Sequence, residues 1–423
     1  MGCMAGTAVA QESDNSLEII NQRMNAPLWV PAEMSELSPA CSNIKGSTNG
    51  DYRKSSEVNY QQAGWEKRIS HDWQFFSGPA ELGKVLVIDT DTSSATPAYR
   101  YLSNGTERDH FEPWSSSKVF AYTAAMAALR QQHKVGGNGY LGQYNIADLI
   151  TSIHSYAPHG TADGDSNAIA SYFANMAGRD FLTRLFHKDW LNLADGHVMF
   201  RGAYETSLLS PEPAVWRASA DEQGSPYQIF AANGDDPGYL PYRCDNCGLT
   251  GNKTMTTLAM AEWLKRLAMH QADPQTRHPF LQAGDIDVLF TGHGHTDANL
   301  PTAGMMRGIS LQLGMAIARA LTLQPELNSE QAEKALNAVT GGKWRIHQKI
   351  GWGPSETRGT GENVMLAQVC LPLKTHTVSF TVAAQASYPG ASDESVLRSG
   401  QKMQQLLDGA MLELLAKKNT VQP

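Results

Sequence analysis

Two short apolar runs mark the first regular structure in the chain. Val85–Ile88 ends at a cluster of turn residues, and Ala98–Leu102 ends at a Ser-Asn-Gly turn. Apolar runs bounded in this way are typical of strands, so two consecutive strands are predicted here. Residues 1–75 are polar, are broken by Pro, Ser and Asn, and show little periodicity. They are predicted to form a leader and an irregular N-terminal extension.

The pattern changes at Ser115. From there to about Gln132 almost every position is apolar, so a helix over this range has no polar face and must lie inside the protein. A second clear helix is predicted over 256–269, where apolar residues recur along one side. A Gly- and Pro-rich stretch, 205–251, separates two helical segments and is too long for an idle loop. We interpret it as a functional or elaborated insertion.

The end of the chain returns to strands. Apolar runs at 344–349, 364–371 and 377–384 are separated by turns. A helix from about 393 to 417 follows, with Ser392 as its N-cap. Strands at both ends, with many helices between them, predict one sheet built from both chain ends and an inserted helical block.

Composition and charge narrow the class of protein. The 423 residues are 41% hydrophobic, which is enough for a substantial core. The net charge is -8 and Lys and Arg form no stripe, which argues against nucleic acid as a partner. No apolar run approaches the ~20 residues of a membrane span. Ala8-Val9-Ala10 resembles the end of a signal peptide and predicts a periplasmic or secreted protein, while Cys3 could be the remnant of a lipoprotein signal.

The closely spaced Cys244 and Cys247 are compatible with zinc, redox chemistry or a small disulfide. A zinc site needs two more ligands at matching spacing, and the chain has no second such pair. A disulfide in an exported loop, or two unlinked thiols, is favoured.

The buried helix begins with Ser115-Ser-Ser-Lys118, a Ser-x-x-Lys motif. Residues three apart in a first helical turn share a face, so the Lys118 amine is expected within reach of the Ser115 hydroxyl. Burial disfavours the ammonium form and lowers the pKa of a lysine, which lets it accept the serine proton. The bare motif also fits a serine-rich helix cap with a solvated lysine.

The surroundings of the motif resemble the serine β-lactamases and penicillin-binding proteins. The similarity includes the strand-turn-strand opening followed by Phe111-Glu-Pro-Trp-Ser-Ser-Ser-Lys-Val119. Far downstream, Lys349-Ile-Gly-Trp-Gly353 is similar to the family's Lys-Thr/Ser-Gly strand. Residues 256–267 resemble the helix that follows the omega loop in class A enzymes. The resemblance covers about residues 84–417.

This resemblance implies an α+β fold. It consists of a five-stranded antiparallel sheet flanked by helices, joined to an all-helical lobe, with the active site between them. Residues 76–423 would form this domain, with the α/β lobe from about 76–118 and 340–423 and the helical lobe from about 119–339.

The resemblance also assigns roles around the nucleophile. Ser115 would attack an acyl carbonyl after Lys118 removes its proton. The backbone N–H of Ser115 and one from the strand near Trp352 would form the oxyanion hole. The implied reaction opens a β-lactam amide and then hydrolyses the acyl-enzyme, with no metal or other cofactor. The alternatives are a penicillin-binding D-Ala-D-Ala peptidase and a domain that binds a β-lactam or a peptidoglycan peptide without turnover.

The resemblance assigns substrate binding to the downstream strand that contains Lys349. Lys349 would hold the substrate carboxylate beside Gly351. Arg358 stands at a spacing similar to that of a carboxylate-binding arginine in class A enzymes, and could bind in two-pronged fashion. Ordinary charges at a strand edge are the alternative for both residues.

The family's second motif, Ser-x-Asn or Tyr-x-Asn, has no clean match. Asp165-Ser166-Asn167 is the best candidate: Asn167 would keep the asparagine, Asp165 stands at the serine position, and Ser166 could replace it after a shift of the loop. Asp165 or Ser166 could instead cap the following helix.

The omega-loop glutamate that activates the deacylating water in class A enzymes is also missing. Its position falls near Leu240, where no Glu stands, and Asp235 and Asp236 have the character of solvated turn acids. A neutral or carboxylated Lys118 could serve instead, as in class D. The sequence therefore supports acylation better than turnover.

A Gly-rich segment with His293, His295 and Asp297 resembles the His-x-His-x-Asp-His motif of metallo-β-lactamases. Two histidines at alternate positions suit zinc, but Ala298 takes the place of the final histidine and few ligands follow. A Gly-rich loop near the substrate cleft is the favoured interpretation.

Overall fold

The computed structural model describes residues 16–34, 38–41, 51–78, 80–94, 96–134 and 136–419. The signal-like residues 8–10 and Cys3 lie outside these ranges.

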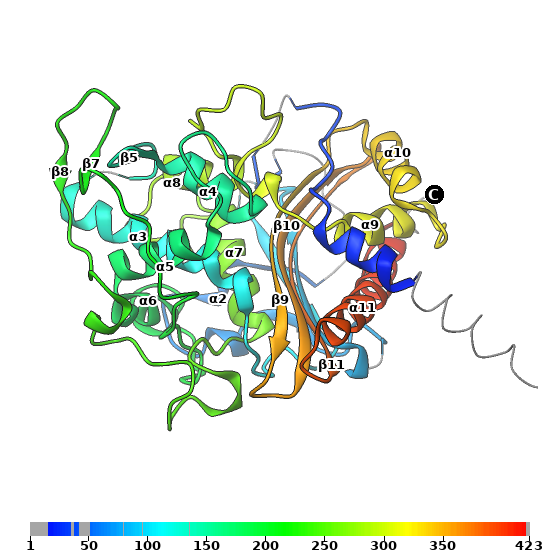
Figure 1. The fold of residues 1–423 in the computed structure, drawn as a ribbon. Coiled ribbons are helices and arrows are strands. Elements are labelled where there is room, and N and C mark those ends of the chain that lie inside the picture. The colour runs from blue at the N-terminus through cyan, green and yellow to red at the C-terminus, as the bar shows by residue number, and fades with distance from the viewer. Residues whose placement is uncertain are drawn as a thin grey trace, which may run out of the picture.

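A mostly antiparallel sheet separates two groups of helices (Figure 1). Five of its strands are neighbours in the order β4 (Ala98–Ser103), β3 (Lys84–Asp91), β11 (Thr377–Pro389), β10 (Thr360–Pro372) and β9 (Arg345–Ser355). The predicted sheet from both chain ends is confirmed, because β3 pairs directly with β11. All five strands lie close to the runs predicted from the sequence.

The sheet is wider than five strands, because two short strands come from the segment predicted to be irregular. β1 (Arg53–Lys54) pairs antiparallel with β4, and β2 (Ser70–Asp72) runs parallel to it. Strands of two and three residues are too short to leave a periodic pattern in a sequence. Residues 16–25 are helical, and Ile20 and Met24 on this helix pack against Val396. The remaining short elements of this part are α2 (Ser55–Val58), η1 (Trp65–Lys67) and η2 (Ala80–Leu82).

One face of the sheet is covered by α9 (Gln312–Thr322), α10 (Ser329–Thr340) and α11 (Asp393–Asn419) (Figure 1). Their apolar side chains share one core with the sheet, so α9 and α10 belong to the sheet layer. The helical block on the opposite face therefore ends before α9, and the lobe boundary expected at 339 is placed too late. The period of a helix reveals which side is apolar, but not which face of a sheet it will cover.

The other face is covered by α7 (Thr257–Ala268), which packs on β3, β10 and β11. The helical lobe lies beyond it (Figure 1). Helix α3 is buried from its start to Leu129, as its lack of a polar face predicts. The lobe consists of α3 (Lys118–His133), α4 (Ile146–Ser155), α5 (Ser166–Ala177), α6 (Arg179–Arg184), the π-helical turn η4 (Leu185–Asp189), α8 (Ala283–Thr291) and the short turn η7 (Gly304–Arg307).

This lobe is not all-helical. At its far end (Figure 1) a small second sheet has the strand order β6-β5-β7-β8. Two of its strands come from the Gly- and Pro-rich stretch, and each strand is too short for a periodic signal. Its strands are β5 (Tyr140–Leu141), β6 (Tyr144–Asn145), β7 (Val215–Arg217) and β8 (Ser225–Pro226), and the same stretch contains the turns η5 (Asn233–Asp235) and η6 (Gly248–Thr250).

Two disulfides are present in the described part of the chain. Cys244 and Cys247 are bonded to each other, which decides between the alternatives left open by their spacing. Cys41 is bonded to Cys370 and fastens the N-terminal segment to β10. None of the described helices combines the length and the apolar character that a membrane crossing requires.

Candidate active site

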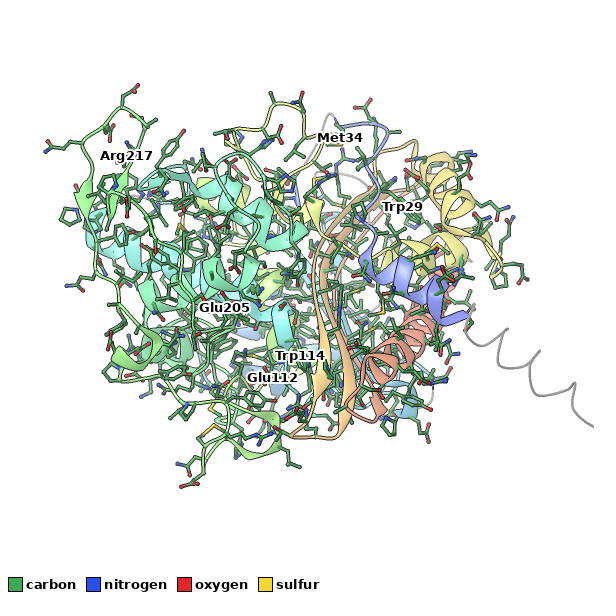
Figure 2. All side chains as sticks on the ribbon, viewed as in Figure 1. Trp29, Met34, Glu112, Trp114, Glu205 and Arg217 are labelled. Atoms are coloured by element: carbon green, nitrogen blue, oxygen red, sulfur yellow. A yellow bond between two sulfur atoms is a disulfide. The ribbon has the colours of Figure 1, made fainter. Side chains whose placement is uncertain are left out.

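Ser115 lies in a tight turn at the boundary between the sheet and the helical lobe. The turn is η3 (Trp114–Ser117), and it leads directly into α3. Trp114 has a φ of 49°, in the left-handed region that costs energy for any residue except glycine. Its indole nitrogen donates to Glu362 Oε2 at 2.6 Å, which holds the turn against β10. Figure 2 shows Trp114 beside β9, with Glu205 on the helical side.

The edge strand β9 packs closely against this turn. A Cβ added at Gly351 would collide with the backbone nitrogen of Ser115, and one added at Gly353 would collide with the Trp114 ring. Both positions therefore require glycine for reasons of space. Since β9 is the last strand of the sheet, one side of its backbone has no strand partner. Gly351 therefore lies close to the nucleophile through backbone-to-backbone packing.

Lys118 is fully buried at the start of α3. Its amine donates to Ser166 Oγ at 2.8 Å and to Asn167 Oδ1 at 2.7 Å. Burial first, and then the charge of Lys253, lower the pKa of Lys118 from 10.5 to about 7, against the opposing pull of nearby carboxylates. A large share of the Lys118 amines is therefore neutral at neutral pH.

Tyr156, which the sequence did not single out, completes the surroundings of the nucleophile. It caps the C-terminus of α4, and its hydroxyl forms a hydrogen bond with the side chain of Ser115. The same hydroxyl accepts a hydrogen bond from Lys349 Nζ at 2.6 Å. Although the residue is 38% exposed, its hydroxyl is directed inward, and burial raises the pKa of Tyr156 to about 12. The phenol is therefore protonated at neutral pH.

Lys349, on β9, is buried and in contact with this tyrosine. Its amine lies 3.9 Å from the centre of the Tyr156 ring and also donates to the backbone oxygen of Ile350 at 3.3 Å. Burial, followed by repulsion from Lys118, holds the pKa of Lys349 well below its usual value. Lys349 is thus connected to Ser115 through the Tyr156 hydroxyl, and its binding of a substrate carboxylate stays a prediction.

The three residues of the predicted motif 165–167 lie at the site, and each makes different contacts. Asp165 accepts a hydrogen bond from the backbone nitrogen of Ala168 and caps α5, one of the two alternatives kept open. Ser166 is buried, receives the Lys118 hydrogen bond and donates to the backbone oxygen of Ile153. Asn167 contacts Lys118 and faces the pocket.

Besides the Ser166 hydroxyl, a second hydroxyl, that of Tyr156, lies at the nucleophile and was not part of the expected motif. Pro158 occupies the place of the asparagine in a Tyr-x-Asn motif, so a search for that motif misses the tyrosine. The asparagine comes from the start of α5.

A carboxylate near Lys118 was also missed. Glu205 forms a side-chain hydrogen bond with Asn167, and Lys118 is close enough to influence it electrostatically. Burial and then the charge of Asp165 raise the pKa of Glu205, while Asn167 and Lys118 oppose the rise. Glu205 stands far upstream of Leu240, where the omega-loop glutamate was sought, so no spacing argument could have found it.

The guanidinium group of Arg358 is hydrogen-bonded to other groups of the protein. Its Nε and Nη2 donate to the two carboxylate oxygens of Glu362, at 2.6 and 2.7 Å. Its Nη1 donates to the hydroxyl of Tyr242 at 3.1 Å and to the backbone oxygen of Leu249 at 2.7 Å. A carboxylate can be held in two-pronged fashion only by free donors, so we do not retain the substrate-binding role expected for Arg358.

A pocket of about 510 Å³ opens beside Ser115. Its walls come from both lobes and include Tyr204, Lys253 and Trp352. Lys253 lies 3.5 Å from the buried Glu112 and 4.4 Å from the centre of the Tyr204 ring. A pocket of this size admits a small molecule, and its lining combines aromatic surface with a few charged groups.

The loop that resembles a metallo-β-lactamase motif does not assemble a metal site with its own three residues. Within the described ranges, His293, His295 and Asp297 do not belong to any group of three or more metal-ligating side chains whose ligand atoms are close together.

Comparison with known proteins gives the following similarities. Neither a family model nor a curated protein matches the chain. A variant of PBP-A solved as its acyl-enzyme complex with penicillin G is 12% identical with a TM-score of 0.38, and the match covers 79% of this chain and 90% of that chain. The chromosome-encoded β-lactamase of Vibrio parahaemolyticus is 13% identical with a TM-score of 0.37, covering 81% and 95%. A β-lactamase from Xanthomonas campestris pv. campestris is 15% identical with a TM-score of 0.39, covering 80% and 92%.

The chain is thus similar in structure, at low identity, to PBP-A and to β-lactamases, including class A enzymes.

Proposed function

We propose that this protein is a serine acyl-enzyme hydrolase that opens β-lactam amides through Ser115. One observation carries the proposal: the Ser115 hydroxyl opens onto the pocket and forms a hydrogen bond with Tyr156, beside two buried lysines of lowered pKa. Burying two amines side by side is costly for a protein, and such perturbed groups cluster at active sites.

In the acylation step, neutral Lys118 accepts the proton of Ser115 as the hydroxyl oxygen attacks the amide carbonyl. The carbonyl oxygen becomes an oxyanion next to the backbone nitrogen of Ser115, where edge strand β9 closes the turn. Tyr156 is protonated and lies beside Lys349, so it can give its proton to the leaving nitrogen as the C–N bond breaks. The proton that Lys118 took from Ser115 then passes to the Tyr156 oxygen, which restores both the phenol and the neutral amine of Lys118.

Deacylation requires a base for water. Glu205 and Asn167 are hydrogen-bonded to each other near Lys118, and the raised pKa of Glu205 makes its carboxylate a better proton acceptor. We assign Glu205 to this step. Water would attack the ester carbon and release the product carboxylate while Ser115 regains its proton.

The substrate class follows from the pocket. With Arg358 engaged by Glu362, the cations that line the pocket and could bind a substrate carboxylate are Lys253 and Arg243. The two disulfides favour an oxidising compartment, which supports export to the periplasm or the exterior. A small β-lactam or a peptidoglycan peptide fits both the location and the chemistry.

The first test is the mass of the intact protein after incubation with a penicillin. We expect an adduct with the mass of the penicillin on the wild type and on Ser116→Ala, and none on Ser115→Ala. The Ser116 variant is a matched control, because it removes a neighbouring hydroxyl from the same turn. An adduct on Ser115→Ala would refute the assignment of the nucleophile. Decay of the wild-type adduct within minutes would identify a β-lactamase, and its persistence a penicillin-binding protein.

The rate of acylation should depend on pH through Lys118. With a pKa of about 7, the neutral fraction and hence the rate should rise about tenfold between about pH 6 and pH 8. Stopped-flow measurement of acylation at saturating penicillin gives this profile. Lys118→Arg remains charged throughout, so its acylation should be slow over the whole range. A wild-type rate that is flat across this window, or Lys118→Arg acylating at the wild-type rate, would be incompatible with Lys118 as the base.

Glu205→Gln should separate the two half-reactions. We expect the acyl-enzyme to form at a rate near that of the wild type but to live about 10²- to 10⁴-fold longer, the usual contribution of a general base. Glu222→Gln, in the distant β7–β8 turn, is the control and should leave the lifetime unchanged. An unchanged lifetime in Glu205→Gln would remove Glu205 from deacylation.

A further inference from the structure

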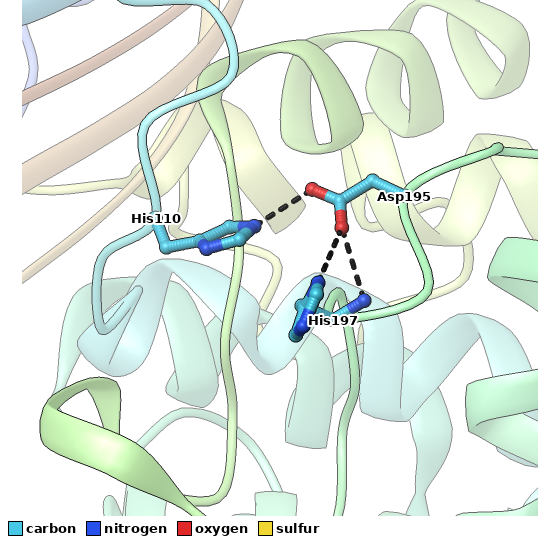
Figure 3. Close-up of side chains that lie close together, drawn as sticks. All are labelled: His110, Asp195 and His197. Atoms are coloured by element: carbon cyan, nitrogen blue, oxygen red, sulfur yellow. Dashed lines mark hydrogen bonds and ion pairs between the residues drawn. The ribbon is translucent and has the colours of Figure 1, made fainter.

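Three side chains with metal-binding chemistry meet on the surface, outside the pocket (Figure 3). His110, Asp195 and His197 each present a ligand atom, and these atoms lie within 4.8 Å of one another. In the part of the chain that the structure describes, no other group of three or more such side chains does so. The proposed acyl-enzyme chemistry does not use any of the three.

Their spacing is close to that of a ligand set. Asp195 Oδ2 lies 2.7 Å from His110 Nε2, and Asp195 Oδ1 lies 3.3 Å from His197 Nδ1. A tetrahedral ion with metal–nitrogen bonds of about 2.0 Å places its ligand atoms about 3.3 Å apart. Small rotations of the side chains would open the His110–Asp195 contact to that separation.

Both histidines are held on a fixed backbone. Phe111, next to His110, exchanges two backbone hydrogen bonds with Met255. Met199 lies two residues after His197, and its backbone nitrogen donates to the backbone oxygen of Thr254, the neighbour of Met255, at 3.0 Å. The segments that carry His110 and His197 are therefore fastened to one common segment, so a ligand set there is largely preorganised.

The three side chains are open to solvent. Side-chain exposures of 33% for His110, 32% for Asp195 and 83% for His197 leave room for an ion to enter and for water to complete its coordination.

We propose that His110, Asp195 and His197 bind one divalent transition-metal ion of the Zn²⁺ type. Two imidazole nitrogens and a carboxylate oxygen, with water in the open position, are a donor set that Zn²⁺ accepts readily. The ion would tie the loop leading to Ser115 to the segment that leads to Tyr204 and Glu205. It would therefore act as a clamp between two walls of the pocket, separate from the serine chemistry.

The experiment titrates Zn²⁺ into the purified full chain in competition with a chromophoric chelator. We expect one tight equivalent for the wild type, and an affinity at least about 100-fold lower for the double variant His110→Ala/His197→Ala, since even the loss of an outer partner of a metal site costs 10- to 100-fold. The matched control, His293→Ala/His295→Ala, removes two histidines from a loop elsewhere in the chain and should bind like the wild type. Ser115→Ala should also bind Zn²⁺ like the wild type, which keeps this test independent of the proposed reaction.

Thermal melting provides a second readout. Zn²⁺ should raise the Tm of the wild type and of the control, but not that of His110→Ala/His197→Ala, because a ligand stabilises only the state that binds it. Melting of that variant without metal, at the wild-type temperature, would show that it folds. The proposal is overturned if the wild type takes up no stoichiometric Zn²⁺, if the His110/His197 variant binds as tightly as the wild type, or if the control loses the ion instead.

Discussion

The site depends on the burial of two lysine amines around one tyrosine hydroxyl. Lys118 and Lys349 are removed from water, and the Tyr156 hydroxyl accepts a hydrogen bond from one of them while contacting the nucleophile. Taking an ammonium out of water costs several kcal/mol, so a buried amine gives up its proton more easily. The same burial keeps the phenol protonated. In the proposed mechanism, a single physical cause, burial, therefore prepares both the base and the acid.

The fold makes this burial possible. Helix α3 has no polar face, so it runs through the interior and carries Lys118 with it. Strand β9 brings Lys349 from the opposite side, and its glycines allow the strand to press on the turn that carries Ser115. A side chain at position 351 would force the strand and the turn apart. The site is therefore a property of the contact between the two lobes and of neither lobe alone.

Much of this arrangement could be predicted from the sequence. The long strands and α3, α7 and α11 have strong patterns, and Ser115, Lys118 and Lys349 belong to motifs that resemble a known family. Tyr156 and Glu205 could not be found, because each is a single residue whose meaning comes from spatial neighbours. Arg358 was singled out by its spacing, but its hydrogen bonds to Glu362 are tertiary contacts that spacing cannot reveal. The short strands of both sheets were not predicted, because they are too short to show a periodic pattern. The hydrophobic pattern of α9 and α10 does not determine which face of the sheet these helices cover.

The central claim is that Lys118 is neutral in a large share of molecules at neutral pH, and its titration tests this most directly. NMR of the protein with ¹⁵N-labelled lysine side chains follows each amine with pH, and the signal missing from Lys118→Met identifies Lys118. We expect a midpoint at about pH 7 for that signal. A midpoint near the ordinary lysine value of 10.5 would contradict it, because Lys118 would then be charged throughout the working range and could not accept the serine proton.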